Sequence, residues 1–201
     1  MTDEEPAALR YAVASSEAAI DSSRTQHPAY VGPHLLVIAD GTRHMSSPGS
    51  ASAIAVERLR RLDTPTAASD MTASLEGGIG GIRETFAELL AANRGWDMTL
   101  AMVTARLWRG THAAIARIGS TGAYLLRGGD LRRLPRSHTL GSVLLEGVAI
   151  QPDELGSDRW HTDILVRWLD WKPGEPADIM LHEAEPRDRY RLSTNADRIG
   201  T

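Results

Sequence analysis

The sequence has no cysteine among its 201 residues. This absence excludes disulfides, zinc sites built on thiolates, and cysteine nucleophiles. Hydrophobic runs of membrane-spanning length are also missing, and the acidic N-terminal segment, residues 1–10, lacks the apolar core of a signal peptide. We therefore expect a cytoplasmic protein without a membrane partner.

A strong charge of either sign is missing too. The formal net charge is -4, which gives no basis for sequence-independent binding of nucleic acid. Hydrophobic residues nevertheless make up 42% of the chain, as in a globular protein. The length suits one well-filled core, so we predict a single domain over residues 1–201.

Several common catalytic patterns are absent as well. No serine stands in a Gly-x-Ser-x-Gly context, and the histidines lack the spacing of a metalloprotease zinc site. The glycine cluster at residues 77–81 has the wrong spacing for a dinucleotide-binding loop, and no predicted strand precedes it. The sequence thus predicts none of these activities.

The most informative stretch is an apolar run at residues 34–39 that stops abruptly at Asp40 and Gly41. It predicts a strand over residues 30–39 that is buried on both faces. An acid at the end of such a strand lies where sheets usually place their chemistry, which makes Asp40 a functional candidate. The alternative is that Asp40 and Gly41 only form the turn that closes the strand.

The other segments predict an α+β protein. Apolar spacings of three and four residues predict a helix that is capped by Ser47 or Ser50 and reaches residue 62, and a second helix at residues 82–93. Residues 63–81 are expected to form a connection between them. A further helix is expected to carry Trp160, Ile164, Trp168 and Trp171 on one face. Other strands are expected at residues 11–20, 98–108, 112–118, 123–127, 131–134, 175–184 and 189–193, with those from 98 to 134 forming one antiparallel meander.

Four segments occur in a collinear order: residues 35–41, residues 53–59, Gly119 with residues 123–127, and residues 188–190. Together they resemble the bacterial metal-dependent protein phosphatases of the PPM, or type 2C, class. The resemblance implies a PPM phosphatase-like α-β-β-α sandwich, in which two antiparallel sheets are flanked by helices. It also implies a catalytic site at one edge of the sandwich, and a chain without the family's usual C-terminal strand and helix.

In that family two divalent cations, usually manganese or magnesium, are held by carboxylates and waters, and a metal-bound water attacks the phosphorus. The resemblance places Asp40 at the carboxylate that bridges both metals. It places Gly41 at the glycine whose carbonyl oxygen is a ligand. Gln26 or His27, depending on a one-residue gap, and Asn195 stand where the family has metal-binding carboxylates.

Other positions also depart from the family pattern, since Asp21 or Ser22 replaces the family's phosphate-binding arginine. The family's Gly-Asp-Ser-Arg motif becomes Gly-Ser-Thr-Gly at residues 119–122, which removes an acid and a base. Arg43 and His44 follow Asp40 and Gly41 and are the candidates for contacting a phosphate. The resemblance thus implies the fold together with a depleted site.

A single charged ligand cannot offset the dehydration and mutual repulsion of two dications, so we expect no tightly bound cofactor. The first hypothesis is a pseudophosphatase that binds a protein partner, a kinase or a phosphoprotein, in phosphorylation signalling. The second is a divergent serine/threonine phosphatase that uses Mn or Mg at a rearranged site. The third is a structural role, in which a partner chain or a second copy covers an exposed sheet edge.

Overall fold

The computed structural model describes residues 28–41, 51–65, 70–94, 99–134, 138–140, 142–143 and 164–194. The strand expected at residues 11–20 lies outside these ranges. No helix in this part of the chain is long and apolar enough to span a membrane. The named elements are, in order, β1 (Ala29–Val31), β2 (Leu35–Gly41), α1 (Ala51–Leu59), the 3-10 helix η1 (Arg60–Leu62), α2 (Met71–Ala92), β3 (Ala101–Arg109), β4 (His112–Ile118), β5 (Gly122–Arg127), β6 (Asp130–Leu134), β7 (Asp178–Glu183) and β8 (Arg189–Ser193).

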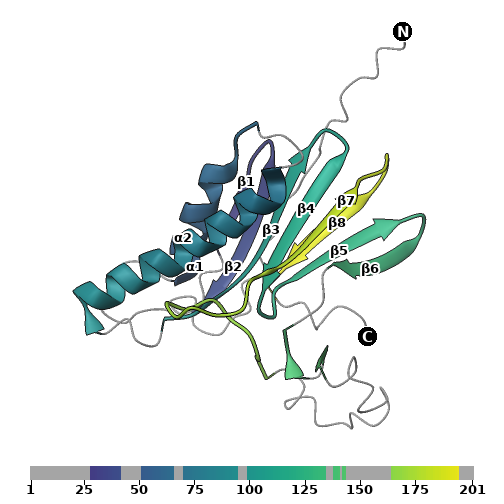
Figure 1. Cartoon of the computed structure of the whole chain (residues 1–201). Helices are drawn as coiled ribbons and strands as arrows, with labels where there is room; N and C mark the ends of the chain where they lie inside the picture. Colours follow the sequence, from purple (N-terminus) through teal and green to yellow (C-terminus); the bar gives the residue numbers. More distant parts are fainter. Residues whose placement is uncertain are drawn as a thin grey trace, which may run out of the picture.

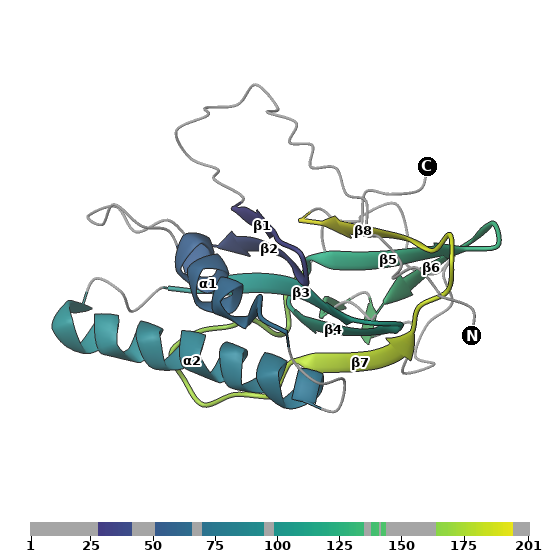
Figure 2. The same cartoon turned by 90° about the horizontal axis from the view of Figure 1, so that it is seen from above.

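Two antiparallel sheets pack face to face (Figures 1 and 2). The larger sheet has the strand order β1-β2-β3-β4-β7, and the smaller sheet has the order β6-β5-β8. α1 and α2 cover the outer face of the larger sheet. This arrangement confirms the α+β class and the predicted pair of antiparallel sheets. The helices expected to flank the smaller sheet are not among the named elements of the described residues.

The strand predicted over residues 30–39 is wrong in detail, because the chain turns back at Gly32 and Pro33. β1 and β2 form a hairpin in which Tyr30 pairs with Val37. The Gly32 N–H donates to the Leu35 carbonyl oxygen at 2.9 Å, and Pro33 has no N–H with which to continue a ladder. β2 is also not buried evenly on both faces: its side chains toward the helices are buried, whereas those toward the smaller sheet are half-buried.

The first predicted helix is confirmed as α1 followed by η1, and α1 begins directly after Ser50, one of the two candidate caps. The second helix is much longer than predicted, because α2 begins at Met71 and includes most of the expected connection. Met71, Leu75 and Ile79 are buried and extend the apolar stripe of the helix. A glycine inside a helix costs about 0.5–1 kcal/mol relative to alanine, whereas burying a large apolar side chain contributes about 1.5–3 kcal/mol. Burial of the stripe therefore outweighs the helix-weakening glycines.

Two glycines of α2 should respond in opposite ways to substitution by alanine. A β-carbon at Gly80 would meet nothing within 4 Å, whereas one at Gly78 would lie 2.9 Å from side-chain atoms of both Leu59 and Leu62. We expect Gly80→Ala to raise the free energy of unfolding by about 0.5–1 kcal/mol in urea denaturation. In Gly78→Ala, overpacking should cancel or outweigh that gain. Equal stabilisation by both substitutions would contradict the close approach of α1 and α2 at Gly78.

The strands from β3 to β6 are confirmed as elements, but they do not form the single meander that was predicted. β3 and β4 belong to the larger sheet, and β5 and β6 belong to the smaller one. The chain changes sheets between Ile118 and Gly122. Gly119 has a φ of +98°, a conformation that L side chains rarely adopt, and it supplies the sharp bend.

The predicted helical face at Ile164, Trp168 and Trp171 is wrong, and Trp160 lies outside the described residues. Residues 164–172 run as an extended segment that is paired antiparallel with β3 at Ala101 and Leu169. Leu169 is fully buried in the core beneath the helices, so the chain is held as a short strand there. Trp168, expected to be a core anchor, is 41% exposed.

Candidate functional site

Asp40 and Gly41 end β2 at one edge of the larger sheet, beside the start of β3. Asp40 is in register with Met102, and Gly41 is in register with Ala101. A β-carbon at Gly41 would lie 2.8 Å from the Leu100 carbonyl oxygen and 3.1 Å from the backbone nitrogen of Ser52. Only glycine therefore lets α1 begin this close to the end of β2.

The described positions that follow Asp40 in the same sheet row, toward β3 and β4, carry no charge. Side chains of one strand alternate between faces, so Asp40 and Met102 both point toward the smaller sheet. The Met102 side chain lies over Gly119, where a β-carbon would be 2.4 Å from its Cγ. The Ser120 hydroxyl donates to the Met102 sulfur at 3.1 Å. The residues that follow Asp40 in this direction are therefore Met102, Gly119 and Ser120, and none of them has a carboxylate.

A buried histidine is hydrogen-bonded to the bend at Gly119, next to this edge. His138 is 4% exposed, and its Nδ1 accepts a hydrogen bond from the Gly119 N–H at 2.9 Å. Its Nε2 therefore carries the ring proton and donates to Asp178 Oδ2 at 2.9 Å. Arg167 donates to Asp178 Oδ1 at 3.0 Å. His138 thus ties the bend at Gly119 to β7 and to residues 164–172.

The electrostatics of this cluster favour a neutral histidine. Burial lowers the pKa of His138, and the cations Arg167 and Arg117 act in the same direction against the hydrogen bond to Asp178. Burial alone raises the pKa of Asp178, but hydrogen bonds from His138 and Arg167 lower it by more. The ion pair of Arg167 and Asp178 with a neutral His138 is the resulting charge state. Sequence analysis treated His138 as one of several scattered histidines, since its partners are distant in sequence.

Stability should fall on mild acidification. Burial also lowers the pKa of His182, whose Nε2 lies 2.7 Å from the Tyr190 hydroxyl oxygen. Below a pH of about 6.5, the pKa of histidine in an unfolded chain, the unfolded state binds protons that the two folded histidines do not bind. The free energy of unfolding therefore decreases. Each histidine contributes at most about 1.4 kcal/mol per pH unit until its folded pKa is reached. Urea denaturation over a pH series measures this slope.

The variant His138→Gln provides the control for this pH dependence. Its amide oxygen can accept from the Gly119 N–H, and its amide nitrogen can donate to Asp178, but it does not titrate. We expect a shallower slope in the variant below about pH 6.5. An unchanged slope would show that His138 protonates as easily in the folded chain as in the unfolded one.

The structure does not describe the other predicted site residues. Gln26, Arg43, His44 and Asn195 lie outside the described residues. Among the residues that are described, no three or more His, Asp or Glu side chains lie close enough together to hold a metal ion. Asp40 and Gly41 are therefore the part of the predicted site that the structure places.

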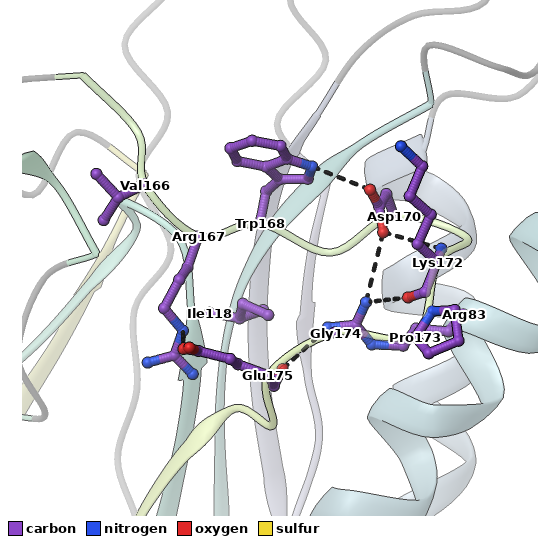
Figure 3. A pocket seen from close by; sticks show the side chains of 10 residues that line it. All are labelled: Arg83, Ile118, Val166, Arg167, Trp168, Asp170, Lys172, Pro173, Gly174 and Glu175. Atoms are coloured by element: carbon purple, nitrogen blue, oxygen red, sulfur yellow. Dashed lines mark hydrogen bonds and ion pairs between the residues drawn. The ribbon is translucent and has the colours of Figure 1, made fainter.

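A cleft of about 300 Å³ opens beside this edge, between α2 and residues 166–175 (Figure 3). Arg83 crosses it and donates to the carbonyl oxygens of Lys172 and Glu175 at 2.8 and 3.1 Å. Arg167 forms an ion pair with Glu175 at 3.0 Å. Both guanidinium groups thus hold the extended segment against the sheet, and neither is positioned to bind a phosphate.

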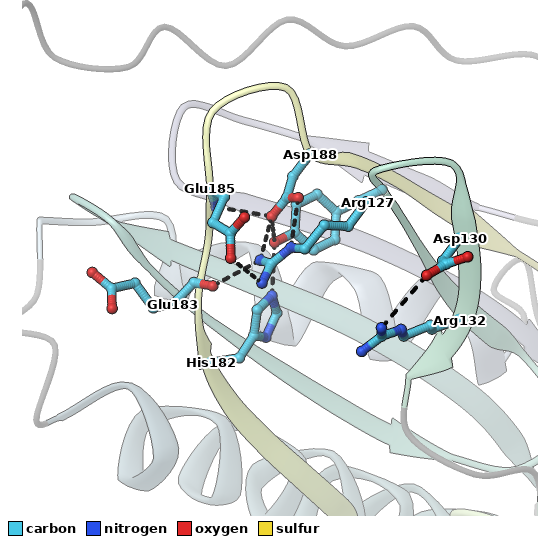
Figure 4. Close-up of polar contacts among 8 residues, drawn as sticks. Arg127, Asp130, Arg132, His182, Glu183, Glu185 and Asp188 are labelled. Carbon is cyan, nitrogen blue, oxygen red and sulfur yellow. Dashed lines mark hydrogen bonds and ion pairs between the residues drawn. The ribbon is translucent and has the colours of Figure 1, made fainter.

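A second polar cluster lies at the opposite end of the sandwich (Figure 4). Arg127 donates to the two oxygens of Asp188 at 2.9 and 2.7 Å, and it forms an ion pair with Glu185 at 2.6 Å. The hydrogen bonds from Arg127 lower the pKa of Asp188 to about 2. Burial raises the pKa of Tyr190 to about 12, so its hydroxyl stays protonated and donates to Asp188. This cluster joins β5 to the turn before β8, and its role is structural.

Between the two ends, Arg106 lies buried between the sheets. It is 1% exposed, and its guanidinium carbon is 3.7 Å from the centre of the Tyr190 ring and 4.8 Å from that of Trp108. Burial lowers its pKa. Such stacking contributes about 0.5–2 kcal/mol, which partly offsets the desolvation of the cation. Arg106 therefore links β3 to β8, a contact that sequence analysis missed because it joins different sheets.

Proteins of known activity are similar to this chain over most of its length. The serine/threonine protein phosphatase PstP of Mycobacterium tuberculosis (strain H37Rv) is 27% identical over 187 residues, which are 93% of this chain and 36% of PstP. The catalytic domain of PstP in complex with two manganese ions has a TM-score of 0.77 at 26% identity, over 91% of this chain and 76% of that one. The chain is therefore similar in both sequence and fold to the serine/threonine phosphatases of the PPM, or type 2C, class.

Other PPM structures share the fold at lower identity. The PPM Ser-Thr phosphatase MsPP of Mycobacterium smegmatis has a TM-score of 0.62 at 21% identity, over 83% of this chain and 73% of that one. PppA, a regulatory component of T6SS in Pseudomonas aeruginosa, has a TM-score of 0.66 at 22% identity, over 83% of this chain and 68% of that one. No protein-family model matches the chain. The chain spans about a third of the length of curated PstP.

The similarity to PPM phosphatases sharpens the interpretation of Asp40 and Gly41. The resemblance assigns the metal-bridging carboxylate to Asp40, and the structure places Asp40 at the end of β2, opposite Met102 of β3. The close packing of Gly41 against Ser52 gives that glycine a structural reason as well. Their metal-binding role stays a prediction.

Proposed function

We propose that this chain is a phosphatase-like binding protein without the binuclear metal centre of PPM enzymes. It acts through a protein partner, a kinase or a phosphoprotein, in serine/threonine phosphorylation signalling. The observation that carries the proposal is the row beside Asp40, where Met102, Gly119 and Ser120 offer no second carboxylate.

The donor set does not fit two divalent cations. Hard cations take several oxygen ligands, and two of them close together repel unless carboxylates neutralise them. Asp40 supplies one charge, and Ser120 stands where the family motif has an acid. Gln26 and Asn195 supply neutral amides at the other ligand positions of the sequence pattern. The catalytic domain of PstP is known in complex with two manganese ions. The proposal rests on the ligand positions at which this chain departs from the family pattern.

A manganese titration combined with a phosphatase assay tests the proposal. We expect no saturable binding of Mn²⁺ at micromolar concentration by calorimetry, and no Mn²⁺-dependent hydrolysis of an aryl phosphate. The matched control is Asp130→Asn, which removes an exposed carboxylate from the β6 end of the smaller sheet. Micromolar binding and turnover that survive Asp130→Asn but are lost in Asp40→Asn would establish the alternative, a divergent Mn- or Mg-dependent phosphatase.

The proposal extends to the assembly state. β1 and β7 end the larger sheet, and β6 and β8 end the smaller sheet, so each presents one side that no other strand of the described residues covers. A partner strand or a second copy pairs readily with such an edge. Sedimentation of the purified chain separates these cases, because a second copy would give a concentration-dependent dimer, whereas a partner-binding edge leaves the isolated chain monomeric.

A further inference from the structure

The outer face of the smaller sheet carries a defined row of side chains. Ala123 and Leu125 of β5 point inward into the core between the sheets, so Tyr124 and Leu126 point outward. Cross-strand pairing extends these two outward positions onto the neighbouring strands. Leu131 and Arg189 flank Leu126, and Arg133 and Arg191 flank Tyr124.

This outer face is basic, whereas the chain as a whole has a net charge of -4. Its arginines come from β6 and β8, and no acidic side chain of β5, β6 or β8 shares the face. Arg189 and Arg191 are exposed, and neither has an ion pair or hydrogen bond within the described part of the chain. Tyr124, on the same face, is only 7% exposed, so the open part of the face is the positively charged region around Arg189 and Arg191.

The described acids of the smaller sheet and of the turn before β8 are already engaged in ion pairs. Asp130 is paired with Arg132 at 3.7 Å, and Asp188 and Glu185 are both paired with Arg127 (Figure 4). Their carboxylates are thus engaged at the turn end of the smaller sheet. They do not cancel the charge of Arg189 and Arg191.

Apolar surface lies next to these cations. Leu131 is 58% exposed, and it neighbours the half-buried Leu126 in the same row as Arg189. Strands in a sheet are about 4.8 Å apart, so the span from β6 to β8 is about 10 Å. A short peptide covers that distance, with an apolar residue on the leucines and acidic residues on the arginines.

We propose that this face docks an acidic segment of a partner protein, with an apolar residue on Leu131 and Leu126 and carboxylates on Arg189 and Arg191. A short acidic segment meets only the basic face. A membrane or a nucleic acid presents an extended anionic surface, which the net negative charge of the chain repels.

The inference deepens the proposed function and rests on it only for the expectation of a protein partner. The basic face and Asp40 lie on different sheets and are tested by different readouts. Loss of peptide binding leaves the manganese result unchanged. A manganese-dependent activity leaves the peptide result unchanged.

Fluorescence anisotropy with a labelled peptide of glutamates around a central leucine tests the docking surface. We expect saturable binding that weakens as the ionic strength rises. The double variant Arg189→Gln/Arg191→Gln should bind roughly fivefold more weakly or worse, since two exposed charge pairs are lost. Leu131→Ser should weaken binding at all ionic strengths, because it removes an apolar contact.

The control variant Arg61→Gln/Arg94→Gln removes the same charge from exposed positions at the ends of η1 and α2. It should bind the peptide nearly as well as the parent chain. Equal losses in the two double variants would overturn the proposal, because the effect would then reflect net charge alone. Binding of a short RNA or of anionic vesicles through Arg189 and Arg191 as tight as that of the peptide would also overturn it. Thermal melting confirms that every variant is folded.

Discussion

Gly119→Ala should destabilise the protein by about 2–5 kcal/mol. Two costs add at this position. The φ of +98° is unfavourable for any residue with a β-carbon, which contributes about 1–2 kcal/mol. The new methyl group would also lie 2.4 Å from the Cγ of Met102 and 2.6 Å from its Cβ, which forces a shift worth about 1–3 kcal/mol. Urea denaturation at neutral pH gives the total.

Gly129→Ala separates these two costs. Gly129 has nearly the same φ, +96°, but a β-carbon there would meet nothing within 4 Å. Its substitution should therefore show only the backbone cost of about 1–2 kcal/mol. Equal losses at Gly119 and Gly129 would contradict the close approach of Met102 to the bend. A larger loss at Gly119 would indicate that the sheet change and the Asp40 edge depend on one tightly packed contact.

Phe86→Ala should cost about 3–5 kcal/mol of the free energy of unfolding. Phe86 is the sole phenylalanine of the chain, and its side chain is fully buried between α2 and the larger sheet. Truncation removes its transfer free energy and leaves a cavity that a packed core fills only in part. Chemical denaturation should show a lower midpoint with nearly the same m-value.

The control for this prediction is Glu88→Ala, an exposed substitution on the same helix. We expect it to change the free energy of unfolding by less than about 0.5 kcal/mol. If Phe86→Ala cost no more than Glu88→Ala, α2 would not pack on the sheet as described. The buried stripe would then fail as the explanation for a helix that contains several glycines.

Part of the candidate site was predictable because its signal is local. An apolar run that ends at an acid and a glycine is visible in the sequence, and the structure places Asp40 and Gly41 at the end of a strand. The surroundings of Asp40 were not predictable in the same way. Met102, Ser120 and His138 come from distant parts of the chain, and only sheet register and the bend at Gly119 bring them to one edge.

The wrong predictions have a common physical cause. The predicted start of the second helix was too late, because the glycine cluster lowers the local helix propensity. Burial of the apolar stripe against the sheet stabilises the helix in spite of these glycines. Residues 164–172 show the opposite error. Their large side chains fit a helical spacing, but pairing of Leu169 with Ala101 holds them extended.

The sequence by itself determined what chemistry is available and where regular strands occur. It excluded thiol chemistry outright, and alternating side chains located β4 and β8 at the observed residues, because a strand's period is visible in its own residues. Only the tertiary structure decided that β4 and β5 belong to different sheets, that His138 supports Gly119, and that Arg189 and Arg191 share an outer face. These features depend on which distant segments pack together, and that choice is set by burial across the whole chain.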